Sequence, residues 1–172
     1  MRKFLTIICF CAFCLIAWAQ PEAKVIKKEC KKFTKAGWMV APVVEPMEVQ
    51  IEKEIRMSKA GYIIAESSKI AKDYTTAKTH AIAEAKKQIQ AILHSEISIW
   101  AESVLQQQIK NSEITDIEQF TSISKQHIEG NLSRAEVVLE CYRIVQNKQT
   151  EVLVRVVYDI ETTKKAIMHS FK

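Results

Sequence analysis

The chain of 172 residues carries 25 Lys and Arg side chains against 20 Asp and Glu, which gives a formal net charge of +5. This nearly even balance argues against nucleic-acid binding, which needs a strongly basic surface. The three glycines leave no glycine-rich phosphate loop, and neither a P-loop nor a dinucleotide-binding fingerprint occurs.

Residues 1–19 have the pattern of a secretory signal peptide. Arg2 and Lys3 provide a positive start, and an apolar run from Phe4 ends in the small-residue cleavage pattern Ala17-Trp18-Ala19. The run is shorter than the roughly 20 residues of a membrane-spanning helix, so we favour cleavage before Gln20 over an uncleaved anchor. We therefore expect export to the periplasm or the outer-membrane periphery, with a mature charge of about +3.

Residues 20–58 are predicted to form a basic, helical N-terminal segment. Ile26, Cys30 and Phe33 make an apolar stripe on a first helix, and Pro46 starts a second helix that runs to about Met57. The first helix either caps the domain, with its lysines in solvent, or lies on anionic lipid or another polyanion. The candidate surface residues are Lys27, Lys28, Lys31, Lys32, Lys35 and Trp38.

Residues 59–172 are predicted to form an α+β domain. A short strand from Tyr62 to Glu66 precedes a polar loop, and Asp73 is placed to cap a long helix from Tyr74 to about Lys110, which contains neither Gly nor Pro. A capping box at Thr115 opens a second helix that ends at Gly130. The predicted polar loop spans Ser67 to Asp73.

The C-terminal third predicts a β-hairpin followed by a closing helix. Two runs rich in Val, Leu and Ile flank Asn147-Lys148, which fits a two-residue loop. That loop places Cys141 opposite Val154 and Glu140 opposite Arg155. It predicts one apolar sheet face with Val137, Leu139, Cys141, Val145, Val152, Val154 and Val156. The predicted ranges are Arg134 to Gln146 and Gln149 to Tyr158 for the strands, and Glu161 to Phe171 for the helix.

These elements predict an α+β fold in which the long helix and a second helix pack on a small antiparallel sheet that ends in the hairpin. Cys9, Cys11 and Cys14 lie inside the signal peptide, and none stands at a lipoprotein acylation site. Cys30 and Cys141 remain. In an oxidising compartment they either form a disulfide or stay as small buried apolar residues.

Residues with catalytic potential show no arrangement that predicts chemistry. His80 and His94 are fourteen residues apart on one predicted helix, roughly 21 Å along its axis, so they cannot share a metal ion. His127 and His169 have no ligand partners at suitable spacing. We expect neither a cofactor nor catalysis, and a small hydrolase with a site assembled from distant residues is the weaker alternative.

The pattern from Gly61 to Tyr158 combines a short strand, a long helix with the spacing Ala77, Ala81 and Ala85, a second helix, and a hairpin that ends in Val-Arg-Val-Val-Tyr. This pattern resembles the LPP-twenty type of bacterial envelope lipoprotein. Relatives of that domain occur in outer-membrane and flagellar-accessory proteins. The resemblance implies an α+β fold and a non-enzymatic envelope role. Where that family has a lipidated cysteine, this chain has Gln20.

The sequence thus favours an exported bacterial envelope protein with a structural or interaction role. Its expected partner is an envelope protein or a membrane surface. The alternative is a module that binds anionic lipid or a polyanion through the segment from Lys24 to Lys35.

Overall fold

The computed structural model describes residues 22–110, 122–124, 126–127, 130 and 132–170. The predicted signal peptide lies outside these residues, as do Phe171 and most of the predicted second helix after Thr115. Of that second helix, residues 122–124, 126–127 and 130 are described, and they are helical.

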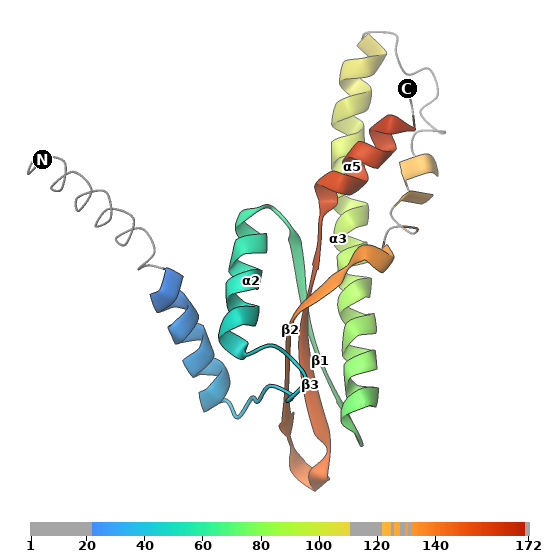
Figure 1. Ribbon diagram of the computed structural model, residues 1–172. Helices are drawn as coiled ribbons and strands as arrows, with labels where there is room; N and C mark the ends of the chain where they lie inside the picture. Colours follow the sequence, from blue (N-terminus) through green and yellow to red (C-terminus); the bar gives the residue numbers. More distant parts are fainter. Residues whose placement is uncertain (1–21, 111–121, 125, 128–129, 131, 171–172) are drawn as a thin grey trace, which may run out of the picture.

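The α+β fold is confirmed, with helices on both sides of a three-stranded antiparallel sheet in the order β1-β3-β2 (Figure 1). A helix of residues 22–35 comes first in the described chain. The main elements that follow it are α2 (Met47–Lys59), β1 (Ile63–Ala71), α3 (Tyr74–Lys110), β2 (Glu136–Ile144), β3 (Thr150–Tyr158) and α5 (Ile160–His169).

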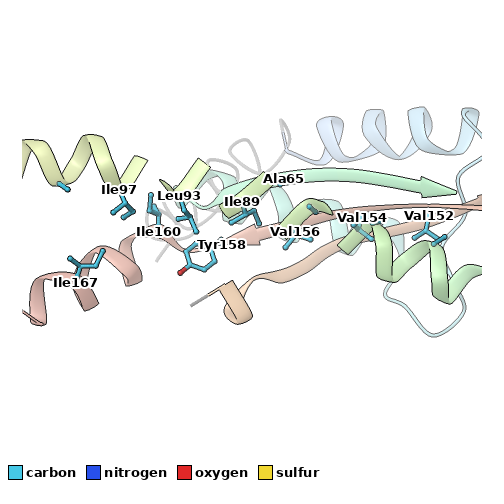
Figure 2. Packing of buried hydrophobic residues seen from close by; sticks show 14 residues of the cluster. Ala65, Ile89, Leu93, Ile97, Val152, Val154, Val156, Tyr158, Ile160 and Ile167 are labelled. Carbon is cyan, nitrogen blue, oxygen red and sulfur yellow. The ribbon is translucent and has the colours of Figure 1, made fainter. Parts of the chain in front are cut away.

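The long helix α3 begins where its cap was predicted. Asp73 Oδ1 accepts the Thr76 backbone N–H at 2.9 Å, and Oδ2 accepts the Thr76 hydroxyl at 2.8 Å. α3 packs against β1 and β3 on the face that we term the inner face. Its alanines let the backbone approach the sheet closely. Buried there are Ala77, Ala81, Ala85, Ile89 and Leu93 of α3 with Val152, Val154 and Val156 of β3 (Figure 2).

The other face of the sheet, the outer face, is covered over β2 and β3 by the N-terminal segment. Figure 1 shows α2 on the side of the sheet opposite α3. A second hydrophobic cluster fills the space between this segment and the sheet, and we term it the outer cluster. Its buried members are Cys30, Phe33, Trp38, Met47 and Ile51 from the segment and Leu139, Cys141 and Leu153 from the strands.

The predicted loop from Ser67 to Asp73 is wrong over most of its length, because β1 continues to Ala71. Ser67 lies opposite Val154 and Ala71 lies opposite Thr150. Pairing with a strand far along the chain supplies ladder hydrogen bonds that the local polar sequence does not signal.

The hairpin loop contains three residues, Gln146–Lys148, and not the predicted two. The Val145 N–H donates to the Gln149 carbonyl at 2.9 Å and closes the ladder one step further out. Asn147 and Lys148 adopt left-handed conformations, with φ of 60° and 57°.

This additional residue shifts the predicted strand register by one. Cys141 lies opposite Leu153 and Glu140 lies opposite Val154, so both predicted pairs are wrong. Since side chains alternate between faces, the shift separates the residues of the predicted apolar face. Leu139 and Cys141 join the outer cluster, and Val152, Val154 and Val156 lie on the inner face.

Candidate functional site

The helix of residues 22–35 presents opposite chemistries on opposite sides. At about 100° per residue, Ile26, Cys30 and Phe33 fall within an arc of about 60°. The lysines fall within an arc of about 140° centred nearly opposite that stripe. We term the set the lysine face, and it consists of Lys24, Lys27, Lys28, Lys31, Lys32 and Lys35.

Docking of this helix on the sheet directs the lysine face into solvent. Cys30 and Phe33 are buried in the outer cluster, and Ile26 packs against it, whereas all six lysines are exposed. Within the part of the chain that is described, the ion pair formed on this face is the one between Lys32 and Glu29. Most of its positive charge is therefore not neutralised by a neighbouring carboxylate.

Arg155 of β3 fastens the helix to the outer face. Its guanidinium donates to both carboxylate oxygens of Glu54 at 2.8 and 2.9 Å and to Glu66 at 2.6 Å. The Phe33 ring lies 5.3 Å from the same guanidinium carbon, in cation–π geometry. Burial acts to lower the pKa of Arg155, but the hydrogen bonds to the two carboxylates outweigh it and raise the pKa. The half-buried charge is thus paired and joins α2, β1 and β3 to the helix.

Trp38 belongs to the docking contact and not to the lysine face. Its side chain is buried in the outer cluster, and the Arg143 guanidinium stacks 4.5 Å from the ring centroid. Arg143 also donates to the Ala36 carbonyl at 3.0 Å and to Glu151 at 2.7 Å. Sequence reasoning missed both arginine contacts, because the predicted register placed Arg155 opposite Glu140.

A second polar cluster lies on the inner face and consists of Glu140, Tyr74 and Lys78. Glu140 Oε1 accepts hydrogen bonds from the Tyr74 hydroxyl and from Lys78 Nζ, the latter at 2.8 Å. Burial, together with the Glu140 carboxylate, raises the pKa of Tyr74. The Glu140 carboxylate is thus paired with a phenol and with an ammonium group. We interpret this cluster as a structural contact that joins the first turns of α3 to strand β2.

Cys30 and Cys141 belong to the outer cluster, and both are free thiols in the structure. Burial raises the pKa of Cys141 to about 12 and also raises the pKa of Cys30. Their pairing in an oxidising compartment stays a prediction. In either form they stabilise the contact between the N-terminal helix and β2 rather than contribute a reactive thiolate.

Among the described residues, no group of three or more His, Cys, Asp or Glu side chains is arranged to hold a metal ion. Over the same residues, none of the helices combines the length and the apolar character that crossing a bilayer requires. In comparisons with known proteins, no family model and no curated protein matched the chain. The candidate site therefore rests on the geometry of the lysine face.

Proposed function

We propose that this chain is an exported, non-catalytic envelope protein that binds anionic membrane surfaces through its lysine face. The observation that carries the proposal is the position of the lysines directly opposite the docked stripe of the same helix. The apolar stripe is used within the fold, so the helix need not leave the domain in order to present its charge.

The expected energetics are those of a polybasic surface. Each Lys close to an anionic bilayer contributes about 1 kcal/mol, and the six lysines extend over roughly 16 Å of helix. The Debye length is about 8 Å at physiological ionic strength, so the lysine charges lie within one or two Debye lengths of one another. Together they suit a reversible attachment that weakens as salt is added.

The shape of the lysine face favours a membrane over a small anion. The lysines are spread over about 140° of the helix circumference and roughly 16 Å of its length, and the hollow that they line is shallow and open, whereas a site for a single phosphate needs donors that converge on one point. Lipid headgroups are spread over a plane and can meet divergent charges. Val25, 48% exposed, lies beside Lys28 on the helix and can contact the interface between headgroups and acyl chains.

The envelope location is supported by the signal-peptide pattern of residues 1–19 and by the resemblance to LPP-twenty type lipoproteins. Because Gln20 stands where those proteins have a lipidated cysteine, attachment would depend on the lysine face. Fractionation of cells tests the location. We expect the protein in the envelope fraction, released by high salt, and a purely cytoplasmic protein would end the proposal.

Binding to vesicles tests the activity itself. We expect the purified protein to sediment with vesicles that contain phosphatidylglycerol, not with pure phosphatidylcholine, and to be released as salt rises to about 0.5 M. Equal binding to both vesicles would contradict the electrostatic proposal. A soluble polyanion, added at the same total negative charge as the vesicles, competes with them for the protein and so distinguishes a lipid surface from a polyanionic partner. Preference for the polymer would contradict the membrane assignment.

A further inference from the structure

The two edges of the sheet are treated differently. The outer edge of β2 is protected: Met39 and Tyr142 exchange two backbone hydrogen bonds of 2.8 Å, and the Gln50 side chain accepts the Glu140 N–H at 2.7 Å. A β-bulge near the start of β2 interrupts that edge further. Such devices prevent a strand from pairing with another chain.

The outer edge of β1 lacks these devices. The strand Ile63–Ala71 pairs with β3 over nine residues without a bulge, and within the described residues no strand or bridge pairs with its other edge. Its two charged side chains are turned to the faces of the sheet. Glu66 binds Arg155 at 2.6 Å on the outer face, and Lys69 lies 3.7 Å from Glu84 of α3. Backbone donors and acceptors therefore remain along the edge.

The faces next to this edge leave room for another strand. Glu66, Ser68 and Ile70 of β1 are exposed, so the N-terminal helices do not cover β1 on the outer face. On the inner face α3 lies over β1 and β3. If a second copy added its β1, the two α3 helices would lie roughly 10 Å apart, which is a normal helix packing distance.

From this geometry we infer that the partner of the β1 edge is a second copy of the chain, paired antiparallel through β1 into a six-stranded sheet. A two-fold axis at Ser67 pairs all nine residues. It places the 54% exposed Ile70 opposite Ile64 of the copy, and Glu66 opposite Ser68 of the copy. No like charges face each other in this register.

The neighbouring registers are worse. Sliding the copy by two residues in one direction places Glu66 opposite its own equivalent, and like charges directly opposite destabilise a sheet. Sliding it the other way loses pairs at both ends and places Ile70 opposite Glu66. A shift by one residue is excluded. The two-fold axis is perpendicular to the sheet, so a residue can lie opposite only a residue of the copy whose side chain points to the same face.

The dimer would also strengthen membrane binding, a consequence that rests on the proposed function. An axis perpendicular to the sheet keeps both outer faces on the same side, so both lysine faces would meet one flat membrane. Two linked binding surfaces bind a vesicle far more tightly than one.

A matched pair of charge substitutions at Ser68 tests the dimer without lipid. Ser68 is exposed and lies opposite Leu153 within its own sheet, so Ser68→Glu and Ser68→Lys burden the monomer similarly. Across the axis, Ser68→Glu sets carboxylates against Glu66 twice, whereas Ser68→Lys creates two opposite-charge pairs. In sedimentation velocity we expect a wild-type dimer, a dissociation constant raised about tenfold or more in Ser68→Glu, and one unchanged or lowered in Ser68→Lys.

Thermal unfolding at low concentration checks that both variants fold. A wild-type protein that sediments as a monomer at the highest attainable concentration would overturn the inference. A dimer that responds equally to both substitutions would overturn it as well, since its interface would lie elsewhere. Because no vesicles are present, neither result depends on lipid binding.

Discussion

Asp73 shows how one side chain determines where the longest helix begins. Its carboxylate accepts the backbone N–H and the hydroxyl of Thr76, and the backbone hydrogen bond is the main cause of its lowered pKa. A carboxylate whose pKa is lower in the folded state adds stability above its unfolded pKa of about 3.9 and loses it as pH falls through the folded value.

Substitution of Asp73 by Asn isolates this charge, because Asn caps a helix without ionising. We expect the wild type to have the higher Tm near neutral pH, and the difference to disappear as the pH falls well below about 4. Thermal unfolding followed by circular dichroism across this range measures the effect. A Tm difference that does not change with pH would show that the charge of Asp73 is irrelevant.

The outer-cluster thiols give a second prediction at this scale. Because Cys30 and Cys141 are buried and their pKa values are raised, neither should react with iodoacetamide in the native protein at pH 8. In protein that has been kept reduced, denaturation should make both thiols available for labelling. Mass spectrometry before and after reduction provides the decisive reading. Labelling of the unfolded protein only after reduction would show a disulfide, and rapid native labelling would contradict the packing of the N-terminal helix.

At the scale of elements, the hairpin loop controls which side chains reach which face. Lys148 holds a φ of 57°, a conformation that costs a residue with a Cβ roughly 1–2 kcal/mol and costs Gly little. Asn147 has a φ of 60°, and Asn tolerates this region better than Lys.

We therefore expect Lys148→Gly to stabilise the protein by about 0.5–1 kcal/mol after the entropy of Gly in the unfolded chain is counted. Asn147→Gly is the matched control and should gain less. Urea denaturation with a common m-value measures both changes. Destabilisation by Lys148→Gly would mean that the loop is not the three-residue loop with two left-handed residues.

Elements with a local cause were predictable from the sequence. α3 was predictable because Asp73 caps it and no Gly or Pro interrupts it, and the hairpin was predictable from its Val-rich runs. β1 was predicted too short, because Ser67–Ala71 becomes a strand only by pairing with β3. The hairpin register was wrong because nothing in Gln146-Asn147-Lys148 signals the third loop residue, and one residue exchanges the two faces.

The candidate site was predictable where it depends on one helix, and not where it depends on contacts between distant residues. Helical spacing identified the lysine face, since its cause lies within one helix. The positions of Trp38, Arg143 and Arg155 required the correct register and the docking of the N-terminal segment on the outer face. These are contacts between residues far apart in the chain, and periodicity carries no information on them.

At the scale of the whole molecule, different parts of the chain pack on the two faces of the sheet. α3 packs on the inner face, while the N-terminal segment covers β2 and β3 on the outer face and directs its lysines into solvent. The arginines that fasten this segment make the lysine face part of the rigid fold rather than a separate tail. Binding should therefore depend on where the lysines lie and not only on how many the chain has.

The most direct test compares two charge-matched triple variants in their binding to vesicles that contain phosphatidylglycerol. Lys27, Lys31 and Lys35 are changed to Gln in one, and Lys72, Lys87 and Lys165, exposed elsewhere, in the other. At about 1 kcal/mol per lysine, the first variant should lose roughly 100-fold in affinity, and the second should stay near the wild type. Equal losses in both would contradict the account, since binding would then follow net charge and not the lysine face.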